Sequence, residues 1–248
     1  RRLFHDVPFP YAKVCERQWT NSIMKIKIDF IDSIIDFDNS NVYSFEIHNK
    51  KYLYRISSLF YGISNGDLPE EIQCFDKDNN ELKISGKIRF FSEYFDFGFD
   101  SKKYSTDITK YILSNIEQYD SDNILRTFSK LCKLIDKELQ KTDLSISVST
   151  DEGIDNVIKM FKLKINQKDD ILDNLLLIID LEVALNSNKI LCFMNLKQFL
   201  TKEEVIEFYK YATYNSIKII MIESSKYDYF GDYEKVIIID QSLEESML

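Results

Sequence analysis

The sequence predicts an α/β protein whose head contains parallel strands and is split along the chain, with a helical leg inserted between its two halves. Three observations predict this architecture. Short β-rich stretches occur toward both ends, helical spacing of apolar residues fills the middle, and a strand–helix–strand order occupies the C-terminal third. With 6 Gly and 3 Pro in 248 residues, long regular elements are expected.

The composition is that of a folded chain with a sizeable apolar core. Hydrophobic residues make up 44% and aromatic residues 14%, which excludes a disordered chain. No stretch approaches the ~20 apolar residues that a membrane helix needs, so no membrane partner is expected. The four Cys lack the spacing of a zinc site or a disulfide framework. We interpret them as reduced, buried thiols of a cytoplasmic protein: Cys15, Cys74, Cys132 and Cys192.

Residues 1–23 differ in character from the rest of the chain. They contain the single Trp and four basic residues against two acidic ones, whereas residues 24–248 carry 28 − 39 = −11. Met24 then opens a strand-like stretch. We therefore interpret residues 1–23 as a fusion or upstream segment.

Residues 24–106 are predicted to form the first part of the head. Apolar residues between Tyr52 and Phe60 recur at helical spacing, and Asp76–Asn80 has the composition of a turn. Strands are predicted at Lys25–Phe30, Val42–Ile47, Ile72–Phe75 and Ile88–Phe91.

Residues 107–185 are assigned to the helical leg. After a first helix, a polar break is expected at residues 119–123, and an amphipathic helix of about four turns should follow over residues 124–139. A short helix is predicted over residues 154–161. Residues 169–185 are apolar almost all round, as in a helix packed on several sides.

Residues 186–248 return to the α/β pattern and form the second part of the head. Thr201 and Glu204 have the spacing of a capping box, so a helix should begin there and continue to about Thr213. A strand–helix–strand connection of this kind implies a parallel pair with a right-handed crossover. Buried strands are predicted at Lys189–Met194, Ser216–Glu223 and Val236–Asp240.

The sequence lacks the motifs of nucleotide-dependent enzymes. A phosphate loop ends in Gly-Lys-Ser/Thr, but Ile88 follows the only Gly-Lys pair, Gly86-Lys87. Outside residues 1–23 the only His is His48, which we interpret as structural. The head is therefore expected to have a degenerate, nucleotide-binding-like fold without a phosphate loop, and the protein is expected not to be an enzyme.

Two function classes stay open despite these missing motifs. The first is a metal-dependent nuclease, because carboxylates together with a Lys hold the divalent cations that clamp a scissile phosphate. Its candidate residues lie in and after an acidic turn: Asp76, Asp78, Glu81 and Lys83. The second is a protein–protein scaffold that does not contact DNA.

The predicted long helix carries the strongest indication of nucleic-acid binding. Five basic residues lie about 200° around the helix from its apolar positions: Arg126, Lys130, Lys133, Lys137 and Lys141. A second basic run comprises Lys159, Lys162, Lys164 and Lys168. An ordinary solvated face is the alternative. Because the net charge is −9, several copies would have to concentrate this face before it could hold phosphates without base readout.

Several segments, in the same order, resemble the type II-A CRISPR-associated adaptation protein family (Csn, second member). Phe193–Val205 resembles a family segment in which a hydrophobic strand ends in Asn and a Phe-Leu-Thr-Lys helix start follows. Ile88–Phe99, Val157–Ile165 and Ile220–Phe230 resemble further segments, so the similarity covers roughly residues 24–240.

This resemblance implies a ring-shaped homotetramer that threads double-stranded DNA ends through a Lys-lined hole, without sequence preference and without an active site. It also implies a role in spacer acquisition during antiviral defence, with CRISPR integrase proteins and the effector nuclease as partners.

The resemblance further implies a structural calcium cluster between the leg and the next short helix. The candidate ligands are Asp143, Asp151, Glu152 and Asp155. Some positions that are acidic in the family are Ser, Val or Asn here. Carboxylates that complement a helix dipole are the alternative explanation for Asp151 and Glu152.

Overall fold

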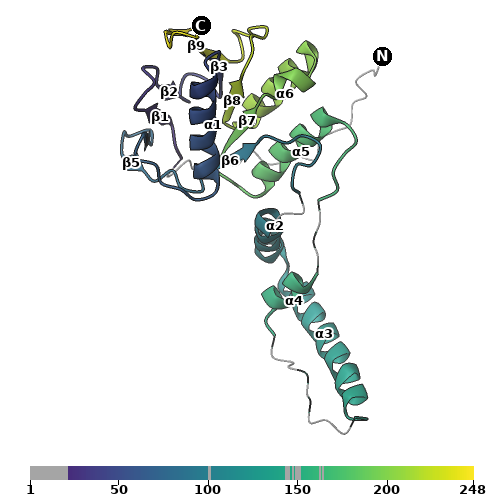
Figure 1. Cartoon of the computed structure of the whole chain (residues 1–248). Coiled ribbons are helices and arrows are strands. Elements are labelled where there is room, and N and C mark those ends of the chain that lie inside the picture. Colours follow the sequence, from purple (N-terminus) through teal and green to yellow (C-terminus); the bar gives the residue numbers. More distant parts are fainter. Residues whose placement is uncertain are drawn as a thin grey trace.

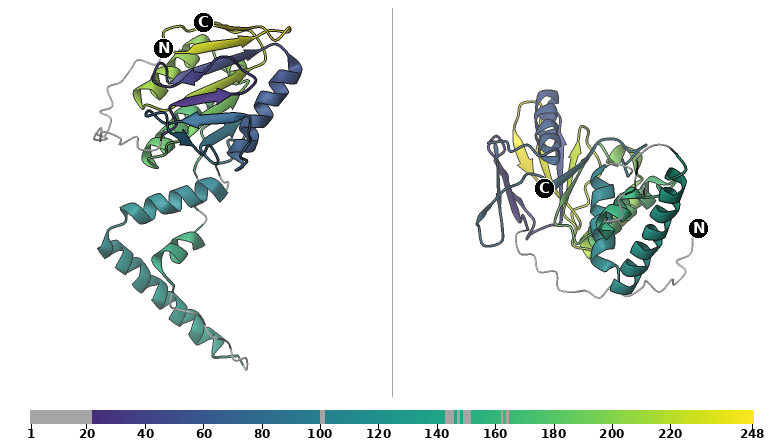
Figure 2. Two further views of the ribbon diagram at one scale, coloured as in Figure 1. Left: turned by 90° about the vertical axis from the view of Figure 1, so that its left-hand side faces the viewer. Right: turned by 90° about the horizontal axis from the view of Figure 1, so that it is seen from below.

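The structure is a computed structural model, and it describes residues 22–99, 102–142, 146, 148, 152–161, 163 and 165–248. The chain folds into an α/β head built on two sheets and a helical leg that projects from it (Figures 1 and 2). The predicted fold class is therefore confirmed.

A six-stranded sheet forms the centre of the head. Its strands are β3 (Val42–Ile47), β6 (Ile88–Phe91), β7 (Ile190–Met194), β8 (Ile219–Glu223), β9 (Lys235–Ile239) and β10 (Glu245–Met247). They lie in the order β10-β9-β3-β8-β7-β6, and all neighbours are parallel except the antiparallel pair β9–β10. The carboxyl ends of five strands therefore meet along one edge.

A smaller antiparallel sheet accompanies the main one. It consists of β1 (Lys25–Ile28), β2 (Ile35–Asp36), β4 (Ile72–Phe75) and β5 (Glu81–Leu82), in the order β2-β1-β4-β5. The sequence predicted strands at β1 and β4, but not that they would form a sheet of their own. Along both strands the side chains that face inward alternate with more exposed ones, which is the pattern of a half-buried antiparallel sheet.

Helices cover both faces of the main sheet. α1 (Lys50–Ser64) lies with the small sheet on one face, while α5 (Ile171–Ala184) and α6 (Lys202–Tyr214) cover the other (Figure 1). Because side chains alternate along a strand, Phe45 of β3 packs in the core under α1, and Val42 packs in the core under α5 and α6. The predicted capping box at the start of α6 is present.

The expected extent of the leg was wrong at its C-terminal end. We assigned residues 107–185 to the leg, but α5 packs on the head, where Leu175, Ile178 and Ile179 share a core with Phe193. A helix that is apolar almost all round needs partners on several sides, and the sheet and α6 provide them. The leg consists of α2 (Lys102–Asn115), α3 (Gln118–Leu139) and α4 (Ile154–Met160).

The start of α3 was also placed wrongly. Residues 119–123, which we expected to be a break, form the first turns of the helix, and the break falls at Ile116–Glu117. Short polar side chains suit a first turn, where Asp120 complements the helix dipole and Gln118 donates a 3.0 Å hydrogen bond to Asp122.

The buried chain includes two residues of the segment that we expected to be foreign. Ser22 and Ile23 are each about 1% exposed. The Lys218 ammonium donates hydrogen bonds to the Ser22 hydroxyl at 2.6 Å and to the Ile23 carbonyl at 2.5 Å. Ser22 and Ile23 are therefore part of the folded head, whereas residues 1–21 lie outside the described part of the chain.

A group of ionic contacts joins the first helix of the leg to the head. The Arg89 guanidinium of β6 lies 3.1 Å from Asp107 of α2 and 3.0 Å from the buried Glu182 of α5. Lys189 also contacts Asp107, at 3.3 Å, and Arg89 lies over the Tyr104 ring. These contacts fix α2, whereas Figure 2 shows α3 extending away from the sheet.

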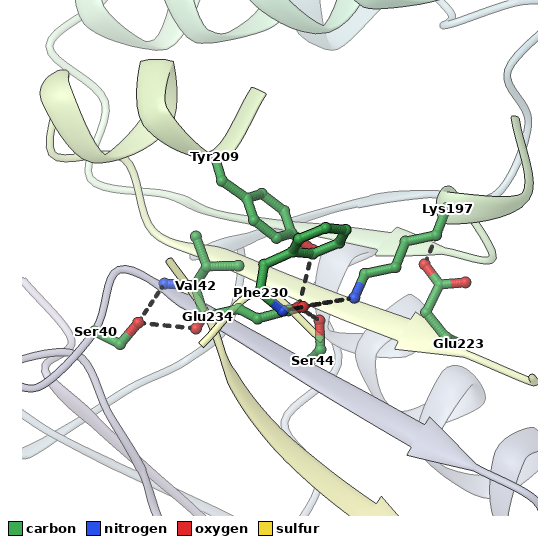
Figure 3. A network of polar contacts seen from close by, with 8 residues as sticks. All are labelled: Ser40, Val42, Ser44, Lys197, Tyr209, Glu223, Phe230 and Glu234. Carbon is green, nitrogen blue, oxygen red and sulfur yellow. Dashed lines mark hydrogen bonds and ion pairs between the residues drawn. The ribbon is translucent and has the colours of Figure 1, made fainter. Parts of the chain in front are cut away.

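A buried ion pair fastens the segment before β9 to the carboxyl edge of the main sheet (Figure 3). Lys197, in the short helix η1 (Lys197–Phe199), lies 2.8 Å from Glu234, and the two side chains are 5% and 0% exposed. Glu234 also accepts hydrogen bonds from the Ser44 hydroxyl, from the Tyr209 hydroxyl at 3.1 Å and from the Phe230 amide at 3.2 Å. Its charge is thus compensated by donors from four separate elements.

We predict that Lys197→Met lowers the free energy of unfolding by about 3–5 kcal/mol, because it leaves a buried carboxylate without its cation. Urea denaturation measures this loss. Lys202→Met is the matched control, since the Lys202–Asp228 pair is more than half exposed on both sides and should contribute little. Equal losses in the two variants would contradict the importance of the buried pair.

Candidate nucleic-acid interface

One face of α3 presents basic side chains to solvent along most of the helix. All five predicted residues are exposed: Arg126, Lys130, Lys133, Lys137 and Lys141. The helix brings the first four to one face, as the spacing predicted, and Lys141 lies just after its end. Lys141 at the C-terminal end is paired with Glu138 at 2.6 Å, and because both side chains are about two-thirds exposed the pair is screened by solvent.

The opposite face of α3 is apolar, and much of it is uncovered. Ser121 and Cys132 are the buried residues of this helix, on the side where α4 packs. By contrast, Leu131 and Ile135 on this face are 52% and 45% exposed, and Leu134, which lies one turn after Lys130 beside the basic face, is 64% exposed. Neighbouring exposed apolar side chains of this kind mark an interaction surface.

The second basic run is only partly within the described structure. Lys159 lies on α4 and forms a 2.8 Å pair with Asp155, and Lys168 is exposed before α5. Lys162 and Lys164 lie outside the described residues. The local charge of Lys159 is thus offset within its own helix.

Half of the candidate calcium ligands are described. Glu152 accepts a 2.8 Å hydrogen bond from the Asn156 amide, and the pairing of Asp155 with Lys159 holds the pKa of Asp155 below its ordinary value. Asp143 and Asp151 lie outside the described residues. Two carboxylates cannot supply the six to eight oxygens that calcium takes. Within the described part of the chain, no group of three or more potential metal ligands forms.

The acidic turn of the nuclease alternative has a structural explanation. One Asp76 oxygen accepts hydrogen bonds from the amides of Asp78 and Asn80 at 2.9 and 2.8 Å, and the other accepts from the Asn80 side chain. These bonds, led by those from Asn80, lower the pKa of Asp76. The predicted turn is confirmed, and its central carboxylate stabilises the β4–β5 hairpin.

Parallel α/β sheets usually bind ligands at their carboxyl edge. Here the start of α1, at that edge, has no loop that could hold a phosphate. Only His48 and Asn49 connect β3 to α1. The Asn49 side chain accepts hydrogen bonds from the amides of Lys51 and Tyr52, which are amides that would otherwise bind an anion.

Two carboxylates that the sequence analysis did not single out lie side by side at the same edge. Glu46 of β3 and Glu223 of β8 are register partners on adjacent parallel strands. Burial raises the pKa of Glu223 to about 7, although its carboxylate accepts a 3.1 Å hydrogen bond from the Lys197 amide. Glu46 contacts the His48 ring at 2.7 Å. Glu223 is the last residue of β8 and Glu46 the last but one of β3, and a carboxylate at the carboxyl end of a buried strand was the signal in the sequence that could have identified them.

These features define a class of protein: an α/β head of nucleotide-binding-like topology that has no phosphate loop and carries an amphipathic leg with one basic face. Residues 66–243, which are more than half of the chain, match the family model described as CRISPR-associated protein (Cas_Csn2). The chain belongs to this family, as the resemblance predicted.

The fold is similar to that of a solved protein, Stu0660 of Streptococcus thermophilus. The two are 14% identical, with a TM-score of 0.52, over 88% of this chain and 75% of that one. At this identity the similarity supports the fold alone. A comparison with curated proteins found no match. In the described residues, no helix is both long and apolar enough to cross a bilayer.

We predict that Glu223→Gln changes how stability depends on pH. Because the folded pKa of Glu223 is raised to about 7, its stabilising contribution is complete below its ordinary value of 4.5 and is lost as the pH rises through 7. Gln cannot ionise, so the variant should gain on the order of 2 kcal/mol relative to the natural chain between pH 5 and pH 8. Urea denaturation at both pH values measures this.

The exposed Glu207 of α6 provides the control, since Glu207→Gln should track the natural chain at both pH values. If Glu223→Gln does the same, the carboxyl of Glu223 titrates normally and is not desolvated.

Proposed function

We propose that this protein is a non-catalytic, double-stranded DNA-end-binding protein of CRISPR spacer acquisition, acting as a ring-shaped homotetramer that threads linear duplexes. The observation that carries the proposal is the two-sided exposure of α3, with basic residues on one face and Leu131 and Ile135 on the other. Membership of a CRISPR-associated family supports the biological setting, which is type II-A antiviral defence.

The two faces of α3 have different tasks in this proposal. The apolar face gains free energy by packing against another copy, at about 25 cal/mol for each Å² of apolar surface removed from water. That packing directs the basic faces of several copies toward a common hole. An acidic subunit of net charge −9 can then hold a duplex, because the local field in the hole is positive while the outer surface stays acidic.

Phosphate contacts of this kind carry no sequence information, so any duplex end is a ligand. The protein would hold DNA in the cytoplasm while its partners, the CRISPR integrase proteins and the effector nuclease, perform the chemistry. We include calcium as a structural ligand at the α3–α4 connection, through Asp143, Asp151, Glu152 and Asp155.

We predict that replacing Lys130, Lys133 and Lys137 with Glu weakens binding of a linear duplex at least about tenfold and flattens its salt dependence, because phosphate contacts are lost. Fluorescence anisotropy across a salt series measures both effects. A relaxed circle of the same sequence should not bind, since it has no end to thread.

The matched control replaces three exposed lysines of the head, Lys27, Lys51 and Lys77, with Glu, so that the change in net charge is the same. This control should retain its affinity. Equal weakening in both triple variants would show that only overall charge matters, and equal binding of circular DNA would exclude threading.

We predict that the natural chain has the mass of a tetramer and that the double variant Leu131→Ser, Ile135→Ser dissociates, because it removes the apolar contact between copies. Size-exclusion chromatography with light scattering measures the mass. The control pair Leu68→Ser, Leu243→Ser changes comparably exposed leucines of the head and should remain tetrameric. A natural chain that stays monomeric contradicts the ring.

Repeating the measurement with a chelator tests calcium, which is excluded if neither mass nor melting temperature changes.

A further inference from the structure

A pocket of about 270 Å³ lies at the carboxyl edge of the main sheet, away from the leg. The ends of β3 and β8 form its floor, and the segment after β8 forms its wall. Its lining includes Glu46, His48, Glu223, Tyr227 and Tyr229. The proposed DNA-binding function uses none of these residues.

The floor of the pocket contains a buried carboxyl oxygen without a hydrogen-bond partner in the described part of the chain. Glu223 is 2% exposed, and among the described residues its Oε2 atom has no hydrogen-bond partner. The buried Lys197 lies beside it, but the Lys197 ammonium is paired with Glu234. Lys197 donates a hydrogen bond to Glu223 only through its backbone amide (Figure 3). A buried polar atom without a partner costs free energy that a donor in the pocket would recover.

The adjacent glutamate adds a second acceptor. Glu46 and Glu223 are register partners on neighbouring parallel strands, and side chains at paired positions point to the same face of a sheet. Glu46 is itself only 9% exposed. Two carboxylates on one wall of a small cavity favour a cationic ligand.

The rest of the lining favours an organic cation over a metal ion. No set of three or more potential metal ligands comes together within the described residues. An ammonium group, in contrast, needs only two or three acceptors, and the rings of Tyr227 and Tyr229 can flank a cation and its alkyl chain. The volume suits a ligand of a few heavy atoms, since drug-sized ligands occupy about 300–1,000 Å³.

We propose that this pocket binds a primary ammonium group on a short alkyl chain, with Glu46 and Glu223 as its acceptors. Either a free diamine or the end of a Lys side chain from another protein has this chemistry. The site is independent of the leg, so it is occupied whether or not the chain binds DNA.

The fraction of the pocket occupied by an ammonium ligand should increase with pH. Burial raises the pKa of Glu223 to about 7, so its carboxylate is largely neutral at pH 6 and ionised at pH 8. The other ionisable groups facing it are Glu46 from β3, His48 just after β3, Lys197 and Glu234 from the buried pair, Tyr94, and Lys226, Tyr227 and Asp228 from the wall.

Calorimetric titration of the full chain with 1,4-diaminobutane, at constant ionic strength, tests the proposal. We expect saturable binding at pH 8, several-fold weaker binding at pH 6, and none of the uncharged 1,4-butanediol. Nα-acetyl-lysine methylamide serves as the second probe. Binding of the diamine alone supports a free amine as the natural ligand, and binding of the lysine derivative alone supports a partner's Lys side chain.

Glu223→Gln should weaken binding at least about tenfold, the effect of removing a hydrogen bond to a charged group, while Glu207→Gln should leave it unchanged. If Glu223→Gln melts at a much lower temperature, Glu46→Gln replaces it. Absence of saturable binding by either amine, or full binding by both acceptor variants, overturns the proposal. So does tight binding of calcium or magnesium that displaces the diamine.

Discussion

The pairing of Lys197 with Glu234 is the contact on which the ligand-facing edge of the head depends. It draws together the short helix after β7, the central strand through Ser44, α6 through Tyr209 and the segment before β9. Such a pair is stable away from water only because both oxygens of Glu234 accept hydrogen bonds. The pair has a second effect. Because the Lys197 ammonium is bound to Glu234, the buried Glu223 has no cation of its own among the described residues.

The molecule separates its charges by distance from this edge. Arg89, Asp107 and Glu182 fix α2 where the leg meets the head, and α3 continues into solvent with its basic and apolar faces both open. The acidic residues of the head therefore do little to offset this face, since charges farther apart than about 8–10 Å are screened by salt, and acidic residues of α3 itself, such as Asp136 and Glu138, offset it in part. A net charge computed over the whole chain says little about the leg.

The sequence predicted those features that depend on local periodicity. Apolar runs gave the strands of the parallel sheet, and the spacing of apolar and basic residues gave the two faces of α3. It failed where a tertiary contact decides the outcome: residues 171–184 have a helical pattern, but nothing local says that the sheet covers them. Glu46 and Glu223 become neighbours only through strand order, so their pairing needs the register of β3 on β8.

The short connection from β3 to α1 bears on how such a protein could work. The Asn49 side chain occupies the amides at the start of α1, which is the position where related α/β folds bind the phosphates of a nucleotide. In the function that we propose, the start of α1 would supply no hydrolysable nucleotide, so loading onto DNA and departure from it would each run downhill, under the control of mass action, salt and competition from other proteins.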